Sequence, residues 1–480
     1  MPLILGTNSI KDTAYEVANS LRFNRGSSDY LNRTFSSGNQ QLWTWSSWIK
    51  RGNLGTFEFL FGNQLDGGTI GYIAFDSNNK LDLNNKVSSS TGGEGNSTMV
   101  FRDVSAWYHI VIVFKGSESS VNDRFEIYVN GVQDTYVSRN SGLSTGNGYV
   151  NSNINHGVGA NASGSGFSHF DGYQAETVFI DGQALDPTSF GEFDSDTNIW
   201  KPKDVSGLTF GTNGFHLDFE NSGSLGADVS GNSNNFTVNN LTSVDQSTDT
   251  CTNNFATLNF LQSALNGNTT IQTFSEGNLQ VITPNTVYSK FGGASTIGAS
   301  QGKWYAEIRV SASGGTYSTY QSIGITGDPS HNANITNTYI GGQSFSAGYY
   351  NQGGLIQVNN STVFTYGTTE SVPYDVMIAM DLDNNKVYFG IDGTWVNSGD
   401  PAGGTGGFTI PASSTVPTGN YFFATYSASS LMTSTYQANF GNPPFTISSG
   451  NSDANGYGNF EYAVPTGYYA LNTKNLAEYG

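Results

Sequence analysis

Short apolar runs that match β-strands recur along the whole chain, and tight-turn residues separate them. In the first half, the runs 106–115 (AWYHIVIVFK) and 124–129 (RFEIYV) are followed by Asn130-Gly131. Asn-Gly accepts the positive φ values that a two-residue hairpin turn requires. In the second half, residues 376–391 (VMIAMDLDNNKVYFGI) form a similar strand–turn–strand pattern. Strands at this spacing, without intervening helices, predict an all-β fold of antiparallel sandwiches.

The run 42–49 (LWTWSSWI) shows how such a strand divides its side chains between two faces. Side chains alternate along a strand, so Trp43, Trp45 and Ile49 share one face and Trp48 lies on the other. We therefore expect these tryptophans to be core residues and not a cofactor-binding group.

Composition supports strands and excludes several partners. Aromatic residues make up 13% of the 480 residues, glycines number 60 and charged residues reach only 12%, which suits strands and turns better than helical bundles. The net charge of −19 repels phosphate backbones, so no nucleic-acid partner is expected. Cys251 is the single cysteine; no intrachain disulfide can form, which fits folding in a reducing cytosol. No run approaches a membrane span and the N-terminus does not match a signal peptide, so we expect no membrane insertion.

The chain is too long for one ordinary domain. Strand patterns fill residues 18–190 and 266–480, and the second of these regions ends in a C-terminal extension. Residues 191–265 are rich in Asn, Ser and Gly and contain chain-breaking prolines, which predicts a structured connector that packs against a domain. Residues 1–17 precede the first sandwich and are a candidate docking arm.

Five motifs follow one another in the first half: SLRF–SDYL, LWTWSSWIKR, AWYHIVIVFKG, RFEIYVNGVQ and FDGYQAETVFIDGQAL. In this order they resemble a laminin-G-like, concanavalin-A-like lectin domain. The stretch from Trp107 to Gly131 is the most specific part, and the likeness covers residues 15 to 190. The resemblance implies a bent two-sheet jelly roll.

The second half has its own set: GKWYAEI (302–308), IGIT (323–326), GYYNQGG (348–354), DVMIAMDLDNNKVYFGIDGTW (375–395) and ANFGNPPFTI (438–447). These motifs resemble a SPRY domain and follow that family's order. The likeness covers residues 270 to 450 and implies a second antiparallel sandwich.

Three further stretches concern the whole chain: the start MPLILGTNSIKD, the middle SGNSNNFTVNNLTSVDQSTDTCTNNFATLN and the end GYYALNTKNLAEYG. They resemble large structural proteins of marine tailed bacteriophages, usually described as tail-fibre or lectin-like virion proteins. This resemblance implies that the protein is made in the host cytoplasm and assembled into a virion, as a tail fibre or as a decoration of the particle surface.

The main enzymatic alternative is a glycoside hydrolase on the same kind of sandwich. Such an enzyme needs two carboxylates on one strand, about 5 Å apart for retention. The nearest pattern is Glu192-Phe193-Asp194, with Thr197 where a further acid should stand, in a turn-like segment. We therefore expect no catalytic residues and no enzymatic activity.

The histidines and the cysteine show no catalytic or metal-ligand pattern. The five histidines are scattered, and no pair has metal-ligand spacing. His109 lies in an apolar strand and is expected to be a satisfied core or interface residue. Cys251 has no neighbouring base in the sequence and is expected to be inert.

Calcium is the one metal that the first resemblance brings in, because laminin-G-like domains often hold Ca²⁺ with loop aspartates and carbonyl oxygens. The alternative is that these acids simply occupy turns, where Asp is favoured. No other cofactor is expected. The candidate ligands are Asp66, Asp76, Asp171 and Asp181.

A glycan is the most plausible ligand. Sugar rings stack their apolar faces on exposed aromatic rings, while their hydroxyls pair with amides, carboxylates and backbone groups. The loop 349–352 (YYNQ) has this mixture, as do Tyr317 and Tyr320. The alternative for each tyrosine is ordinary packing at a sandwich edge. The candidate glycan-binding residues are Tyr339, Tyr349, Tyr350, Asn351 and Trp395.

The sequence thus favours a phage virion protein that takes part in assembly and adheres to a host-surface glycan. Its expected partners are other virion proteins, further copies of itself in a homo-oligomer, and a host-surface polysaccharide. A polysaccharide-degrading enzyme and a cellular adhesin are the alternatives.

Overall fold

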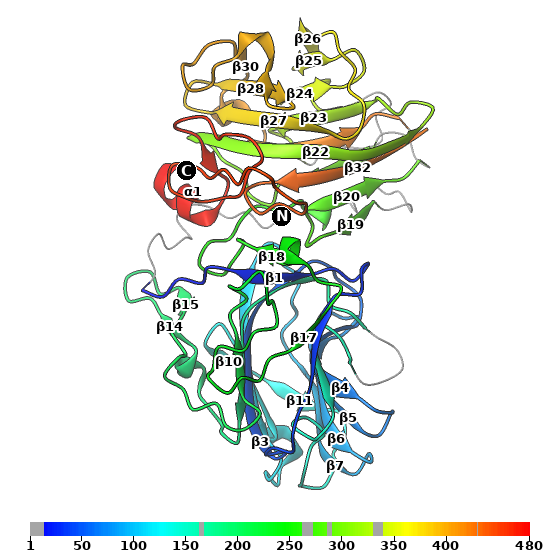
Figure 1. Cartoon of the computed structure of the whole chain (residues 1–480), viewed down its shortest axis with the longest axis vertical. Helices are drawn as coiled ribbons and strands as arrows, with labels where there is room; N and C mark the ends of the chain where they lie inside the picture. Colours follow the sequence, from blue (N-terminus) through cyan, green and yellow to red (C-terminus); the bar gives the residue numbers. More distant parts are fainter. Residues whose placement is uncertain (1–13, 163–167, 262–271, 286–289, 330–338, 430) are drawn as a thin grey trace. The chain divides into compact units, whose positions relative to one another are not determined.

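The computed structural model describes residues 14–162, 168–261, 272–285, 290–329, 339–429 and 431–480 (Figure 1). Strands dominate it, and its one α-helix in the described ranges is α1 (Thr473–Tyr479). The prediction of an all-β fold is confirmed. No helix in these ranges is long and apolar enough to cross a lipid bilayer.

The chain divides into two compact units, Thr13–Thr252 and Asn253–Gly480. The segment 191–265, which the sequence assigned to a connector, is shared between them. Its residues up to 252 belong to the first unit, and those from 253 to the second.

The first unit is a sandwich of two antiparallel sheets. One sheet contains, in spatial order, β10 (Val132–Asp134), β9 (Phe125–Val129), β8 (Trp107–Lys115), β3 (Leu42–Arg51), β13 (Gly172–Asp181), β1 (Ser20–Phe23) and β18 (Gln246–Ser247), with β16 (Phe215–Leu217) also on β13. The other contains β11 (Tyr136–Ser138), β7 (Thr91–Ser97), β6 (Leu81–Val87), β5 (Ile70–Phe75), β4 (Glu58–Gln64), β12 (Asn155–Val158), β2 (Tyr30–Thr34) and β17 (Thr237–Asn239). A separate hairpin joins β14 (Gly191–Phe193) to β15 (Trp200–Pro202).

Strand alternation in β3 follows the prediction. Trp43, Trp45 and Ile49 are buried in the core between the sheets. Trp48 lies on the opposite face in a second apolar cluster with Trp200. The outer face of this sheet is therefore apolar as well, and the part of the chain after β13 covers it.

The predicted Asn-Gly hairpin joins β9 to β10. Asn130 and Gly131 have φ values of 49° and 78°, as the turn requires. A Cβ atom on Gly131 would lie 2.4 Å from the ring of Trp200. Glycine at position 131 therefore allows both the positive φ of the turn and the close approach of Trp200, which belongs to the part of the chain that covers this sheet.

The second unit is also built from two sheets, which are antiparallel except for the parallel pairing of β33 with β22. The larger contains β19 (Thr273–Ser275), β20 (Gln280–Thr283), β32 (Met432–Asn439), β22 (Lys303–Gly315), β27 (Tyr374–Asp381), β28 (Lys386–Ile391) and β29 (Thr394–Trp395), with β30 (Phe408–Thr409) on β28 and β33 (Tyr469–Ala470) on β22. The smaller contains β21 (Lys290–Ala294), β31 (Phe422–Ser427), β23 (Gln321–Thr326), β24 (Ser346–Tyr350), β25 (Leu355–Val358) and β26 (Ser361–Thr365). In Figure 1, β27, β22 and β32 run beside one another.

The larger sheet of the second unit also has an apolar outer face. Tyr305, Met377 and Tyr388 from its strands pack against Phe460 and Tyr468 of the C-terminal extension. Both units thus cover one sheet with later parts of their own chain.

His109 lies on the covered outer face of the first unit. Its Nδ1 accepts a hydrogen bond from Trp200 Nε1 at 2.9 Å, so its proton is on Nε2, which donates to Ser46 Oγ at 2.9 Å. Burial lowers the pKa of His109 to about 3, and the ring stays neutral. The prediction that His109 is a satisfied core residue is confirmed.

This buried neutral histidine predicts acid sensitivity of the first unit. The pKa of His109 is lower in the folded protein than its unfolded value near 6.5. Its contribution to the free energy of unfolding is therefore complete above pH 6.5 and is lost as the pH falls towards 3. The loss is at most about 1.4 kcal/mol per pH unit. We expect chemical denaturation at pH 7, 6, 5 and 4 to show that the stability gap between wild type and His109→Gln narrows towards acid. Parallel profiles for the two proteins would contradict the assignment.

Candidate functional site

Strand β24 separates the two adjacent tyrosines of the predicted binding loop. Tyr349 points into the core between the sheets and is fully buried. Tyr350, the next residue, points to the other face, because side chains alternate along a strand. Neither ring is open to solvent, because Tyr350 is itself only 7% exposed.

Four tyrosines, one of which is Tyr350, form a series of ring contacts. The ring of Tyr350 stacks on Tyr339 with centroids 4.6 Å apart and planes at 15°, and Tyr320 meets it edge-on at 5.8 Å. Tyr317 follows, 4.8 Å from Tyr320, and is 39% exposed. We call these four residues, together with Gln352, the tyrosine cluster.

Local structure brings the members of the tyrosine cluster together. Tyr317 and Tyr320 lie in the turn between β22 and β23, where the Tyr320 N–H donates to the Tyr317 carbonyl at 3.1 Å. Gln352 lies in the turn after β24. Strands β23 and β24 pair with Ser322 opposite Tyr350, so the two turns are neighbours at one end of the smaller sheet.

Gln352 gives the tyrosine cluster its polar end. Its Nε2 donates to the Tyr320 hydroxyl at 3.1 Å, and the Tyr350 hydroxyl donates to its Oε1 at 3.2 Å. Burial raises the pKa of Tyr350, so the phenol remains a donor. Within the described residues, the side-chain hydrogen bonds and ring contacts of these tyrosines are with one another and with Gln352, and Tyr339 also packs against an apolar cluster that contains Ile340 and Phe422. An uncharged cluster of this kind suits an uncharged ligand.

Two other predicted glycan-binding residues have structural roles. The Tyr349 hydroxyl donates to Asn351 Oδ1 at 3.1 Å. Asn351 is 1% exposed, accepts from the Glu370 N–H at 2.7 Å and donates to the Glu370 carbonyl at 3.0 Å. Asn351 therefore ties the β24–β25 turn to the segment before β27 and does not face solvent.

The fifth predicted residue, Trp395, lies on the other sheet. It is half-buried and packs against the apolar cluster of the covered outer face, with its ring 6.5 Å from Tyr305. The structure therefore brings Tyr339 and Tyr350 together and places Tyr349, Asn351 and Trp395 elsewhere.

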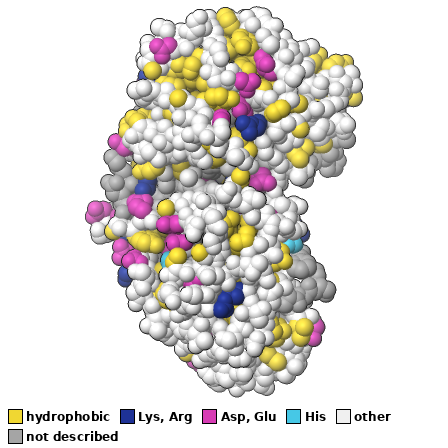
Figure 2. Space-filling view, viewed as in Figure 1, with side chains coloured by type: hydrophobic (Ala, Val, Ile, Leu, Met, Phe, Trp, Pro, Cys, Tyr) yellow, Lys and Arg dark blue, Asp and Glu magenta, His cyan; other side chains and the backbone are white. Residues whose placement is uncertain are grey.

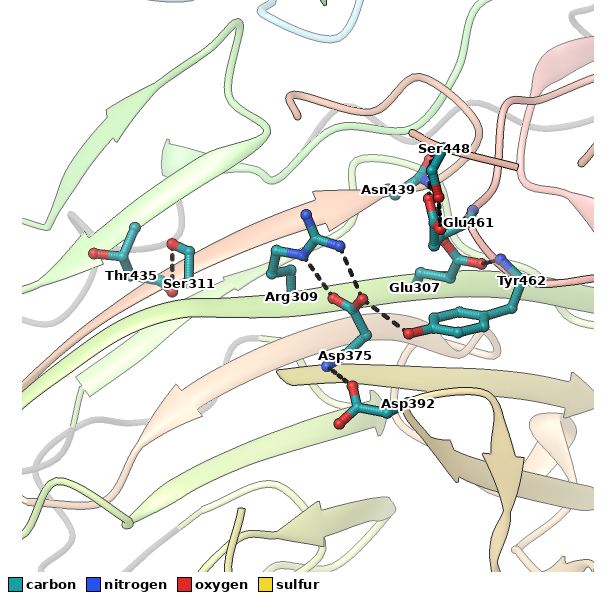
Figure 3. A network of polar contacts seen from close by, with 10 residues as sticks. All are labelled: Glu307, Arg309, Ser311, Asp375, Asp392, Thr435, Asn439, Ser448, Glu461 and Tyr462. Carbon is teal, nitrogen blue, oxygen red and sulfur yellow. Dashed lines mark hydrogen bonds and ion pairs between the residues drawn. The ribbon is translucent and has the colours of Figure 1, made fainter. Parts of the chain in front are cut away.

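A polar network that the sequence did not predict lies on the same outer face as Trp395 (Figure 3). Arg309 makes a two-pronged ion pair with Asp375, at 2.8 and 2.9 Å, and the Tyr462 hydroxyl donates to Asp375 at 3.1 Å. Asp392 accepts from the Asp375 N–H at 2.8 Å. Glu307 and Arg309 share a face of β22 because side chains alternate along a strand, but their partners come from distant segments.

Glu307 anchors the C-terminal extension to β22. Its Oε1 accepts from the Tyr305 hydroxyl at 2.9 Å and the Tyr462 N–H at 2.8 Å. Its Oε2 accepts from Asn439 Nδ2 at 3.1 Å and the Glu461 N–H at 3.0 Å. Burial raises the pKa of Glu307 to about 7, although these donors oppose the shift. With four donors in place, this carboxyl group holds the extension and is not directed at a ligand.

The four predicted calcium ligands lie at separate positions. Asp66 accepts from Gly68 N and Thr69 N, both at 2.7 Å, in a turn. Asp181 is buried and accepts from Asn39 N at 2.9 Å, Asn151 Nδ2 at 2.6 Å and Asn213 N at 3.1 Å. In the described ranges no three His, Cys, Asp or Glu side chains gather as metal ligands do.

Asp76 and Asp171 have similarly local surroundings. Asp76 accepts from Asn78 N at 2.8 Å and Lys80 N at 2.9 Å. Asp171 is 8% exposed, and its Oδ1 lies where a Cβ on Gly52 would be only 2.8 Å away. The carboxylates of Asp66, Asp76 and Asp181 are therefore accounted for by local turns and a strand end.

The acidic pair that suggested an enzyme lies in the β14–β15 hairpin. Lys201 Nζ lies 3.0 Å from Asp194 and 3.5 Å from Glu192. Hydrogen bonds from the Thr197 backbone and from Lys201 lower the pKa of Asp194. An ionised and lysine-paired acid is poorly suited to protonating a leaving group. Burial raises the pKa of the Cys251 thiol, which does not favour a nucleophilic thiolate.

An open cleft of about 790 Å³, which the sequence did not predict, lies in the described part of the first unit. It lies beside β9, β10 and β11, and its lining includes Lys115, Glu126 and Asp134. Lys115 Nζ contacts Glu126 at 2.5 Å, while the rings of Phe125 and Tyr136 are buried in the core. The cleft therefore lacks an exposed aromatic platform, and the tyrosine cluster is the better candidate for a sugar.

Comparison with known proteins agrees with the lectin-like sandwich of the first unit. Residues 25–188 match a family model described as the concanavalin A-like lectin/glucanases superfamily. A search of the curated proteins found no match.

Solved structures with similar folds exist for both kinds of sandwich, all at low TM-scores. A putative carbohydrate binding protein from Bacteroides ovatus is 16% identical over 48% of this chain, which spans 60% of that protein, with a TM-score of 0.34. The SPRY domain of human HERC1 is 12% identical over 33% of this chain and 87% of its own, with a TM-score of 0.25. A heptameric SAP-like pentraxin from Limulus polyphemus is 17% identical over 36% of this chain and 80% of its own, with a TM-score of 0.27.

The network around Arg309 predicts a stability effect in the second unit. Asp375→Asn keeps the size of the side chain but removes the charge that faces the half-buried guanidinium. We expect a loss of about 1–3 kcal/mol in the free energy of unfolding, measured by denaturant titration. Asp383→Asn is the matched control, because its amide oxygen can still accept from the Gly302 N–H. Equal stability of the two variants would show that the ion pair does not hold the extension.

Proposed function

We propose that the chain is a structural protein of a bacteriophage particle and that its second unit binds an uncharged host-surface glycan at the tyrosine cluster. The observation that carries the binding proposal is the meeting of Tyr317, Tyr320, Tyr339 and Tyr350 beside Gln352. Exposed aromatic rings with a few polar groups are the usual composition of a site for a small organic ligand. Tyr317, at 39% exposure, offers the ring face.

The negative net charge of the chain favours an uncharged ligand over an anionic one. With 38 acidic and 19 basic residues, the chain carries a net charge of −19. On the face that Figure 2 draws, Lys and Arg side chains are few and scattered. An anionic polysaccharide would be repelled by this field unless basic residues were concentrated at its site, and among the described residues the hydrogen bonds and ring contacts of the tyrosine cluster involve no Lys or Arg.

The virion role is supported by the resemblance of the chain's start, middle and end to structural proteins of marine tailed bacteriophages. In this proposal the protein is made in the host cytoplasm, assembles with other virion proteins as a homo-oligomer, and acts by binding without catalysis. Tail fibre and surface decoration are its two possible positions on the particle.

The binding proposal predicts that the exposed ring of Tyr317 and the half-buried ring of Tyr320 carry the affinity. We expect Tyr317→Ala together with Tyr320→Ala to weaken glycan-array binding at least about tenfold, the equivalent of about 1.4 kcal/mol, with little change in the thermal unfolding of the protein. Phe193→Ala removes an exposed aromatic of the first unit and is the matched control. Wild-type glycan binding by the folded double variant would refute the site. Release of reducing ends from a polysaccharide would instead favour the enzyme.

The virion proposal has a separate test. We expect mass spectrometry of purified phage particles to find this chain in stoichiometric amounts, and labelling with an antibody against it to place it at the tail or on the head. The matched control is a non-structural phage protein, which should be absent from the same preparation. Absence of this chain from intact particles would contradict the assignment.

A further inference from the structure

A lysine and an aspartate from opposite ends of the first unit meet in its interior. Lys50 Nζ lies 2.6 Å from Asp249 Oδ2, and the two residues are 199 positions apart. Their side chains are 1% and 0% exposed. Complete burial of such a pair is costly, because both ions lose their water.

Strand register explains why Lys50 lies among aromatic rings. Lys50 on β3 is opposite Trp107 on β8 and Tyr173 on β13. The three side chains therefore form one row on the outer face of the sheet, and Lys50 Nζ lies 5.7 Å from the centre of the Tyr173 ring. Trp107 and Tyr173 belong to the apolar cluster under the covering segment.

Trp107, in the same row as Lys50, supplies a hydrogen-bond donor for the second carboxylate oxygen of Asp249. Trp107 Nε1 donates to Asp249 Oδ1 at 3.1 Å. The backbone of Asp249 is fixed as well: its N–H donates to Ser247 Oγ at 3.1 Å, and its carbonyl accepts from Ser20 Oγ at 2.6 Å. The carboxyl group is thus held with one oxygen at the amine and one at an N–H donor.

From this geometry we propose that Lys50 and Asp249 condense to form an intramolecular isopeptide bond, which joins β3 covalently to the end of the first unit. Burial of both side chains excludes the water that would otherwise separate the amine from the carboxyl group. Reacting atoms in a near-attack arrangement are about 3–3.5 Å apart, and here the amine already touches the carboxyl group that it would attack.

The reaction needs no other reactant. Lys50 first transfers a proton to Asp249 Oδ2, and its nitrogen lone pair then attacks Cγ to form the C–N bond. The charge that develops on Oδ1 is stabilised by the Trp107 N–H, as in an oxyanion hole. The C–Oδ2 bond breaks, and Oδ2 leaves as water with the proton it received and a second one from the nitrogen.

In the other lysine–carboxylate ion pairs of the described residues, the lysine side chain is not fully buried. Lys86–Glu94, Lys115–Glu126, Lys201–Asp194 and Lys303–Asp381 all have lysine side chains that are 12% to 30% exposed. Arg51–Glu58 is fully buried, but a guanidinium remains protonated and is not a nucleophile. The inference rests on the Lys50 site alone and is independent of the proposed function.

Intact-mass measurement of the denatured protein tests the bond directly. We expect the wild-type mass to be lower than the sequence mass by one water molecule, and peptide mapping to find one branched peptide containing Lys50 and Asp249. Lys50→Arg should have the full mass of its own sequence. Lys303→Arg is the matched control and should retain the water loss.

Two further variants test the chemistry. Asp249→Asn should lose ammonia in place of water and reach the same product. Trp107→Phe keeps an aromatic ring but removes the N–H, and should lose water more slowly in a time course after refolding. A folded wild-type protein that keeps its full sequence mass after prolonged incubation contains an ordinary buried ion pair, and this result would overturn the proposal.

Discussion

The arrangement of both units depends on one constraint: a sheet that is apolar on both faces must be covered on both faces. In β13 every residue is buried, and in β3 every residue after the first. One face of these strands packs against the opposite sheet of the sandwich. The other face needs a cover, and in each unit later parts of the same chain provide it. Burial of apolar area drives this arrangement, but it does not fix where the cover sits.

Buried polar contacts fix the position of the covers. The indole N–H of Trp200 ends on the imidazole of His109, while in the second unit Glu307 receives the N–H groups of Glu461 and Tyr462. Apolar contacts are not directional, whereas a buried donor or acceptor without a partner costs about 1–3 kcal/mol. Each contact of this kind therefore favours one register of the cover over shifted alternatives.

Much of the fold could be predicted from local sequence, because a hairpin is specified by neighbouring residues. The alternation in LWTWSSWI assigned the tryptophans correctly to two faces, and Asn130-Gly131 marked a real turn. The candidate site was harder. Adjacent tyrosines in a strand must point to opposite faces, yet the sequence of β24 does not say which face is the core, so Tyr349 and Tyr350 were grouped together. Asp181 resembled a loop-edge ligand because its three hydrogen-bond donors come from distant segments.

The covers also create two chemical environments, one buried and one open to solvent. The same types of residue behave differently in each. Under a cover, water is excluded, so the proton on His109 is bound weakly and the carboxyl group of Glu307 holds its proton more tightly. Lys50 and Asp249 share this environment, where an amine and a carboxyl group interact strongly because no water competes for them. Tyr317 and Tyr320, by contrast, lie in the turn between β22 and β23, where Tyr317 is 39% exposed to solvent. A polar group beneath a cover therefore serves the cohesion of its own unit, and the binding site that we propose lies where Tyr317 reaches solvent.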